Sequence, residues 1–129
     1  MPKQILIVDD GNTVRQVIRA FLETKTNFRV CGEAVDGLDA IEKAQALKPD
    51  LILLDLAMPR MNGADAAMEL RRIMPEVPIV MFTMYDENVS KSLISSLGIK
   101  AVISKPNGMR NLVSCVEGLL RSEPTVTHS

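Results

Sequence analysis

Short apolar runs alternate with amphipathic stretches along almost the whole chain, and this alternation constrains the fold more than any other feature. Apolar runs of four to six residues favour strands, whereas apolar residues that recur every three or four positions favour helices. The strand patterns lie at residues 4–10, 28–34, 51–55, 78–83 and 99–105. The helix patterns lie at residues 12–25, 37–47, 64–74, 87–97 and 109–120. A fivefold alternation predicts a parallel sheet with helices on both faces, because parallel neighbours need crossover connections.

The character of the strands predicts their order in that sheet. Residues 28–34 and 99–105 alternate between apolar and polar, as expected of strands with one wetter face, whereas the other three runs are strongly apolar. Two wetter strands at the edges of three buried ones fit the order 2-1-3-4-5. The predicted fold is therefore α/β, a (βα)5 doubly wound parallel five-stranded sheet of the flavodoxin-like type.

Length and charge restrict the broad class of protein. A chain of 129 residues has the size of one domain, and we expect a folded unit over residues 1–122 followed by a flexible tail at residues 123–129. The formal net charge of -1 provides no basic field for direct nucleic-acid binding by this chain. No apolar run is long enough to span a membrane and no signal peptide is evident, so we expect a cytoplasmic protein without membrane contact.

Cysteine and histidine offer little for catalysis or metal binding. Cys31 and Cys115 form no CxxC pair, and both are predicted to be small core residues. The only histidine, His128, lies in the polar tail, which argues against histidine-based catalysis.

Polar side chains follow the predicted strands at the points where they end. The acids Asp9 and Asp10 follow the first strand, Asp55 follows the third, Thr83 ends the fourth and Lys105 ends the fifth. The carboxyl ends of parallel strands all lie at one edge of the sheet. Ligand sites form at this edge, at the point where the strand order reverses. Three carboxylates packed together repel one another unless a cation compensates their charge. All-oxygen ligation of this kind predicts a Mg²⁺ site.

The same edge suits phosphoryl transfer. A carboxylate beside a bound Mg²⁺ is able to attack phosphorus and form an aspartyl phosphate. Such a transfer depends on neutralising charge on the phosphoryl oxygens. The ammonium of Lys105 and the hydroxyl of Thr83 have the chemistry to do this.

With these residues in order, the chain resembles a two-component response-regulator receiver domain of the CheY-like kind over residues 3–121. The motifs that carry the resemblance are Asp9-Asp10, "LLDLAMPRMNG" around Asp55, Thr83 closing "PIVMFT", and "SKP" with Lys105. Each motif is weak alone, but together and in this order they are highly specific.

The resemblance implies a role for each position. Asp55 is expected to be the phosphoacceptor, and Asp10, Asp55 and the backbone carbonyl of Ala57 to ligate Mg²⁺, with Asp9 acting mainly through bound water. Thr83 and Lys105 are expected to contact the phosphoryl oxygens. The donor would be a sensor histidine kinase or a histidine phosphotransfer protein. The face formed by the fourth helix, fifth strand and fifth helix would then change. This is self-modification rather than turnover, so no enzyme in the ordinary sense is expected.

Several positions depart from the commonest family pattern. Ala57 and Tyr85 stand at two positions that in this family tune how long the acyl phosphate survives. Val102 stands where an aromatic residue is frequent, and a stiff β-branched side chain cannot swing as a ring does. Met84 follows Thr83 where a small residue is usual. The effect of either on switching is not predicted.

Other functions fit the site residues less well. A Mg²⁺-dependent aspartyl-phosphate phosphohydrolase would carry a second acid two residues after its nucleophile, where Ala57 stands. A flavin-binding module would need a phosphate-cradling loop where "DDGN" presents two carboxylates, and signalling without phosphorylation is disfavoured by the intact site. Stand-alone signalling to a protein partner, a fused DNA-binding output domain outside this chain and a phosphorylation-linked homodimer stay open.

Further predictions concern individual charged, capping and apolar residues. Glu33, Asp36 and Asp39 are predicted to be solvated charges. Asn12 or Thr13 is predicted to cap the first helix, and Leu38 to lie on the apolar stripe of the second.

Overall fold

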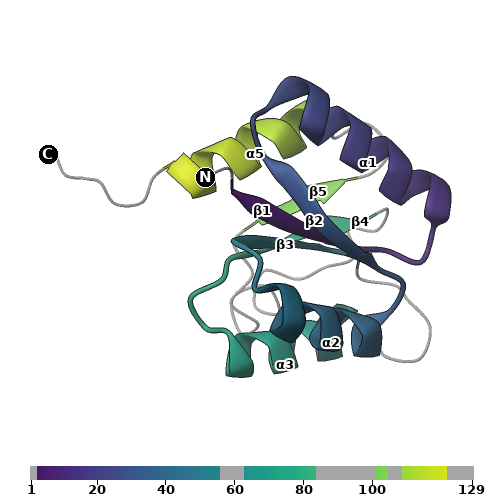
Figure 1. Cartoon of the computed structure of the whole chain (residues 1–129), viewed down its shortest axis with the longest axis vertical. Helices are drawn as coiled ribbons and strands as arrows, with labels where there is room; N and C mark the ends of the chain where they lie inside the picture. Colours follow the sequence, from purple (N-terminus) through teal and green to yellow (C-terminus); the bar gives the residue numbers. More distant parts are fainter. Residues whose placement is uncertain (1–2, 56–62, 84–100, 105–108, 122–129) are drawn as a thin grey trace, which may run out of the picture.

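The computed structural model describes residues 3–55, 63–83, 101–104 and 109–121 (Figure 1). Within them, the strands form one five-stranded sheet with the order β2-β1-β3-β4-β5, and every neighbouring pair is parallel. The strands are β1 (Gln4–Val8), β2 (Arg29–Ala34), β3 (Leu51–Leu54), β4 (Ile79–Thr83) and β5 (Ala101–Ser104).

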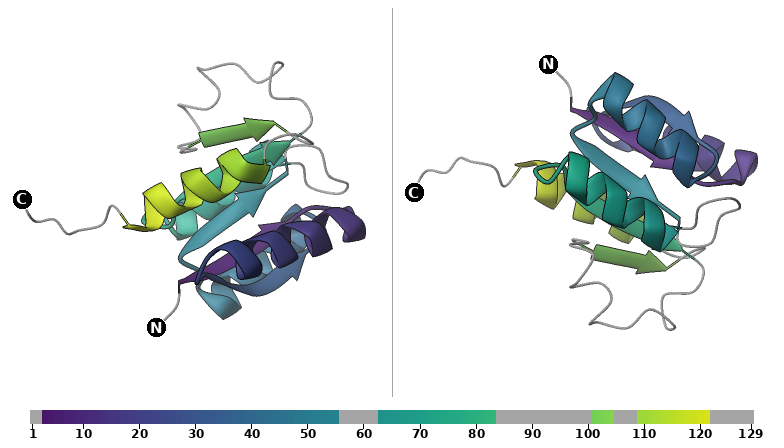
Figure 2. Two further views of the ribbon diagram at one scale, coloured as in Figure 1. Left: turned by 90° about the horizontal axis from the view of Figure 1, so that it is seen from above. Right: turned by 90° about the horizontal axis from the view of Figure 1, so that it is seen from below.

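The described helices cover both faces of the sheet. They are α1 (Asn12–Lys25), α2 (Gly37–Leu47), α3 (Gly63–Ile73) and α5 (Met109–Arg121). Helices α1 and α5 lie together on one face, and α2 and α3 lie together on the other (Figures 1 and 2). The predicted flavodoxin-like α/β fold with a parallel sheet is confirmed. The helix expected at residues 87–97 lies outside the described residues.

Two hydrophobic cores sandwich the sheet, and this explains the apolar runs in the sequence. Alternate residues of β1 point to opposite faces: Leu6 and Val8 join the core under α2 and α3, whereas Ile5 and Ile7 join the core under α1 and α5. All four residues of β3, Leu51–Leu54, are at most 1% exposed. A central parallel strand is buried on both faces, so its sequence is continuously apolar.

The edge strand β2 differs from the centre in the way the sequence predicts. Val30 is buried, whereas Arg29 is exposed and Cys31 and Glu33 are partly exposed. A Cβ added at Gly32 would lie 2.6 Å from Cδ1 of Leu47 at the end of α2, so this exposed side chain would have to shift to admit it.

Two of the local predictions are wrong. The N-cap of α1 is Gly11, which has no side chain to cap with, and the side chain of Asn12 instead accepts a hydrogen bond from Arg15 at 3.2 Å.

Leu38 is 48% exposed, because α2 packs through its smaller residues Ala40 and Ala44. These alanines share a core with Ala66 and Ala67 of α3, and small side chains let two helices and a sheet approach closely.

The two cysteines are half-buried, unpaired thiols that pack against the core under different helix layers. Burial raises the pKa of both thiols above their ordinary value. Their predicted role as small core residues is confirmed. Among the helices described, none is both long and apolar enough to cross a lipid bilayer.

Candidate metal centre

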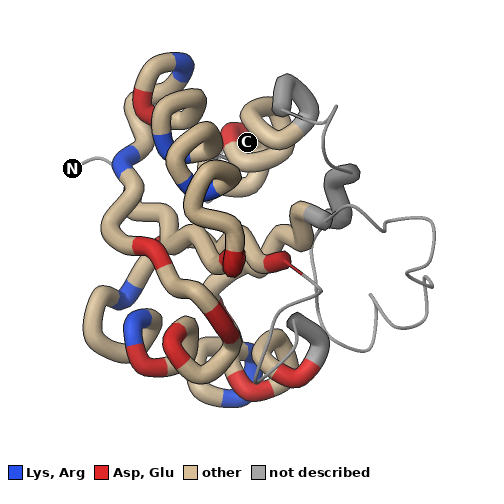
Figure 3. Tube along the Cα trace, turned by 90° about the vertical axis from the view of Figure 1, so that its right-hand side faces the viewer, with Lys and Arg blue, Asp and Glu red and all other residues tan. Residues whose placement is uncertain are grey.

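Three carboxylates meet at the carboxyl edge of the sheet. One oxygen from each of Asp9, Asp10 and Asp55 lies within 4.8 Å of the others. Asp9 and Asp10 follow β1, and Asp55 follows β3, its neighbour in the sheet. Figure 3 shows the acidic segments of the tube, several of which lie near one another in this view. The predicted convergence of these acids is therefore observed.

The three acids differ in their exposure to solvent. Asp9 is 3% exposed and Asp55 is 8% exposed, whereas Asp10 is exposed. Burying negative charge is costly unless hydrogen bonds or a cation compensate it. The cluster therefore has two buried acids, Asp9 and Asp55, and one acid, Asp10, on the solvent side.

The backbone fixes Asp9 and Asp55 beside each other. The amide of Asp55 donates to the carbonyl of Val8 at 2.9 Å, and the amide of Asp9 donates to the carbonyl of Ala34 at 3.0 Å. Both bonds extend the strand pairing of the sheet by one residue. The positions of the two carboxylates thus follow from the register of β1 with β3 and β2.

The loop after β1 is closed by a local hydrogen bond. Oδ1 of Asp9 accepts from the amide of Gly11 at 2.8 Å, in the manner of an Asx turn. A Cβ added at Gly11 would lie 3.3 Å from this same Oδ1, which is a close approach. The small residue therefore lets the loop turn tightly around the carboxylate of Asp9.

The donor set fits a hard divalent cation. Ligand oxygens around an octahedral Mg²⁺ lie about 3 to 4 Å apart, because each is about 2.1 Å from the ion. Carboxylate oxygens already within 4.8 Å of one another need only a small contraction to reach this spacing. Such a site commonly takes one or two carboxylates and leaves the other positions to water or phosphate.

The other predicted site residues are placed less completely. Thr83 is the last residue of β4, and its backbone pairs with Ser104 of β5. Its position at the carboxyl end of a central strand agrees with the prediction. Lys105 and Ala57 lie outside the described residues, as do Met84 and Tyr85. Val102 lies in β5, paired with Met81.

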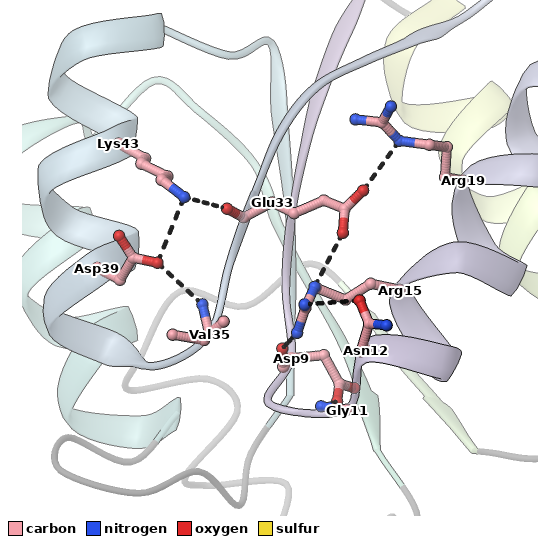
Figure 4. A network of polar contacts seen from close by, with 9 residues as sticks. All are labelled: Asp9, Gly11, Asn12, Arg15, Arg19, Glu33, Val35, Asp39 and Lys43. Atoms are coloured by element: carbon pink, nitrogen blue, oxygen red, sulfur yellow. Dashed lines mark hydrogen bonds and ion pairs between the residues drawn. The ribbon is translucent and has the colours of Figure 1, made fainter.

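A buried arginine behind the acids was not predicted. Arg15 of α1 is 9% exposed, and its Nη1 donates to the backbone carbonyl of Asp9 at 2.7 Å. Its Nε donates to Oε1 of Glu33 at 2.9 Å, as Figure 4 shows. The signal in the sequence is its spacing, since Arg15 shares the buried stripe of α1 with Ile18 and Leu22.

The prediction that Glu33, Asp36 and Asp39 are solvated charges is wrong. Glu33 forms ion pairs with Arg15 and Arg19, and Asp36 is 3% exposed and caps α2 by accepting from the amide of Asp39 at 2.8 Å. Asp39 accepts from the amide of Val35 at 3.1 Å and pairs with Lys43 (Figure 4). Asp36 and Asp39 thus hold the chain between β2 and α2, whereas the Glu33 carboxylate links β2 to α1.

Comparison with known families identifies the class of protein to which the chain belongs. The sequence matches the family described as "Response regulator receiver domain" over residues 5–117. The chain belongs to this family. It is a receiver domain of the two-component response-regulator type, with the CheY-like, flavodoxin-like fold.

Similar proteins and structures agree with this assignment. The receiver domain is 38% identical over 125 residues to the response regulator protein VraR of Staphylococcus saprophyticus, covering 95% of this chain and 59% of the relative. It therefore spans about three-fifths of the length of the curated relatives it matches.

Two solved structures have a similar fold. The response regulator domain of Thermotoga maritima CheB has a TM-score of 0.82 and 27% identity, covering 99% of this chain and 100% of that one. A LuxR-family two-component response regulator from Aurantimonas sp. SI85-9A1 has a TM-score of 0.86 and 26% identity, covering 93% and 86%.

Proposed function

We propose that this receiver domain is a phosphorylation-dependent switch in which Asp55 accepts a phosphoryl group while Mg²⁺ is bound. The observation that carries the proposal is the meeting of Asp9, Asp10 and Asp55 within 4.8 Å at the carboxyl edge of the sheet. Family membership supports the same reading.

The residues of the chain would divide the work of binding Mg²⁺. Asp10, Asp55 and the backbone carbonyl of Ala57 would hold the ion, and Asp9 would act mainly through bound water. When bound, the ion would neutralise negative charge on the phosphoryl oxygens and on the carboxylates around it. The 8% exposure of Asp55 limits approach to a donor that enters over this edge of the sheet.

The transfer itself is a substitution at phosphorus. An oxygen of the Asp55 carboxylate attacks, a P–O bond forms, and the P–N bond to the imidazole of a donor phosphohistidine breaks. The imidazole leaves and takes a proton, so Asp55 becomes an acyl phosphate. Thr83 would donate its hydroxyl to a phosphoryl oxygen, and Lys105 would offset the added negative charge.

The new charge would act at a distance through the neighbouring strand ends. We propose that Thr83 and Lys105 respond to it and that the face formed by residues 87–97, β5 and α5 changes for a partner. The donor would be a sensor histidine kinase or a histidine phosphotransfer protein in the cytoplasm. The domain modifies itself and turns over no external substrate, so we propose that it is not an enzyme in the ordinary sense.

The length of the relatives is informative about how the domain would pass on its signal. Because the chain matches 59% of the length of VraR, a fused output domain in a longer protein is the arrangement that this comparison supports. Residues 1–122 would form the receiver unit and residues 123–129 a flexible segment after it. Stand-alone signalling to a protein partner is the alternative, and a phosphorylation-linked homodimer is compatible with either.

The experiment that tests the proposal is incubation with acetyl phosphate followed by intact-mass measurement. The wild-type domain is expected to gain one phosphoryl group in Mg²⁺ and none in excess EDTA. Asp55→Asn is expected to gain none. Asp65→Asn, which removes an exposed acid in the first turn of α3, is the matched control and should gain the group like the wild type. Incorporation by Asp55→Asn at the wild-type level would refute the proposal.

A further inference from the structure

The guanidinium of Arg15 occupies a position directly behind the acidic cluster. It uses each of its three nitrogens: Nη1 donates to the carbonyl of Asp9 at 2.7 Å, Nε donates to Glu33 at 2.9 Å, and Nη2 donates to Asn12 at 3.2 Å (Figure 4). An arginine that is 9% exposed and bonded in three directions has little freedom to move.

Arg15 adds a side-chain restraint on Asp9. The amide of Asp9 is bonded to Ala34, its Oδ1 to the amide of Gly11, and its carbonyl to Arg15. The first two bonds come from the backbone of the sheet and the loop. The third comes from a side chain, and it fixes the peptide plane between Asp9 and Asp10. That plane determines the direction in which the chain presents Asp10.

Glu33 holds the guanidinium at this position. Its two carboxylate oxygens pair separately with Arg15 at 2.9 Å and with Arg19 at 3.0 Å. The Glu33 backbone is itself held, because its carbonyl accepts from Nζ of Lys43 at 2.5 Å. Figure 4 shows this network running from α2 through the edge strand β2 to α1 and the end of β1.

We propose that Arg15 is a positioning residue for the Mg²⁺ site and that Glu33 keeps its guanidinium in place. This inference rests on the proposed function, because it assigns a role in binding the same ion. Arg15 acts through the backbone of Asp9 and contacts neither the ion nor the phosphoryl group. Groups that orient metal ligands in this way typically change metal affinity about 10- to 100-fold when they are removed.

The sign of the effect separates positioning from simple electrostatics. A positive charge near a cation site repels the cation, so on charge alone the loss of Arg15 would tighten Mg²⁺ binding. Loss of a restraint on Asp9 and Asp10 would weaken binding, because the ligands must then be ordered when the ion enters. The two roles of Arg15 therefore predict opposite changes in the dissociation constant.

The test is a titration with Mg²⁺ alone, followed through ¹H–¹⁵N spectra of the folded domain. Arg15→Met is expected to raise the dissociation constant at least tenfold and to shift the amides of Asp9, Asp10 and Gly11 before any ion is added. Arg19→Met is the matched control. Arg19 lies on the same helix and pairs with the other carboxylate oxygen of Glu33. Its loss leaves the bond from Arg15 to the carbonyl of Asp9 in place, so binding should stay within about twofold of wild type.

Two further variants test the same role if Arg15→Met does not fold. Glu33→Gln leaves the guanidinium without its charged partner, and we expect it to weaken Mg²⁺ binding as well. Arg15→Lys keeps the charge but cannot hold Asp9, Glu33 and Asn12 at once, so an intermediate dissociation constant is expected.

The outcomes distinguish this inference from the proposed function. Unchanged or tighter binding in Arg15→Met or Arg15→Lys, with Mg²⁺ binding to the wild type intact, overturns the positioning role alone. An equal weakening in Arg19→Met also overturns it, because the effect would then belong to helix α1 in general. A wild type that binds no Mg²⁺ overturns both.

Discussion

The amide of Asp55 donates a hydrogen bond to the carbonyl of Val8 at 2.9 Å. This bond continues the pairing of β3 with β1, and it places Asp55 beside Asp9, the residue that follows Val8. The ordinary hydrogen bonding of a parallel sheet therefore brings these two buried acids together, and Asp10 follows in the loop after β1. The strand register that builds the core also builds the site.

Crowded carboxylates should make the free domain sensitive to the loss of one charge. In EDTA we expect Asp10→Asn to unfold at a higher temperature than the wild type, because the substitution removes repulsion from Asp9 and Asp55. With Mg²⁺ the wild type should gain stability, about 1.4 kcal/mol at an ion concentration of ten times the dissociation constant. Asp10→Asn should gain much less. Thermal unfolding with and without Mg²⁺ measures both effects.

Glu42→Gln is the control for this comparison, since it removes an exposed negative charge from α2. It should respond to Mg²⁺ as the wild type does. An Asp10→Asn variant that is destabilised in EDTA, or that is stabilised by Mg²⁺ as strongly as the wild type, would contradict the account of the site.

The cap of α2 should contribute to stability without affecting ion binding. Asp36 is 3% exposed and its Oδ1 accepts from the amide of Asp39 at 2.8 Å. Asp36→Ala leaves this amide without its acceptor, so we expect a loss of about 1 to 2 kcal/mol in the free energy of unfolding. Urea denaturation in EDTA measures the loss.

Asp36→Asn is the matched variant for the cap, because an amide oxygen is able to accept the same bond. It should retain more stability than Asp36→Ala, and neither variant should change the dissociation constant for Mg²⁺. Equal losses in the two variants would show that Asp36 does not act as a cap.

The two half-buried thiols predict a fall in stability at alkaline pH. Burial raises the pKa of Cys31 and Cys115, so an unfolded chain loses these protons at a lower pH than the folded domain does. The unfolded state then binds fewer protons, and stability falls as the pH rises above about 8.5, the ordinary thiol pKa, towards the raised value. Below that range the contribution is fully present.

Denaturant unfolding between about pH 7 and 10 tests this expectation. The variant with both Cys31→Ala and Cys115→Ala should show a shallower decline than the wild type, whatever its stability at neutral pH. Parallel curves would mean that the thiols do not contribute to the slope.

Much of the fold and the site could be predicted because both depend on regular geometry. The continuous apolar run Leu51–Leu54 indicated a strand buried on both faces, and it is one. The convergence of Asp9, Asp10 and Asp55 followed from strand ends sharing an edge, which requires only the alternation of strands and helices and an order for the sheet.

The features that could not be predicted depend on packing between elements. Leu38 is more hydrophobic than Ala40, yet Leu38 is 48% exposed whereas Ala40 faces the core, where it packs with Ala66 and Ala67 of α3. Arg15 and Glu33 lie far apart in the sequence, and they form an ion pair only because α1 packs against β2 in the folded domain. Periodicity places Arg15 on the buried stripe of α1, but it does not indicate which acidic side chain pairs with it.

The most direct test of the central claim is to locate the phosphoryl group on the chain. After phosphorylation in Mg²⁺, borohydride reduces an acyl phosphate to an alcohol, so a phosphorylated aspartate is recovered as homoserine in peptide mapping. We predict homoserine at position 55 alone, and at none of the neighbouring acids Asp9, Asp10 and Asp65. Homoserine at one of those positions with none at 55, from a domain that incorporates phosphate, would contradict the account.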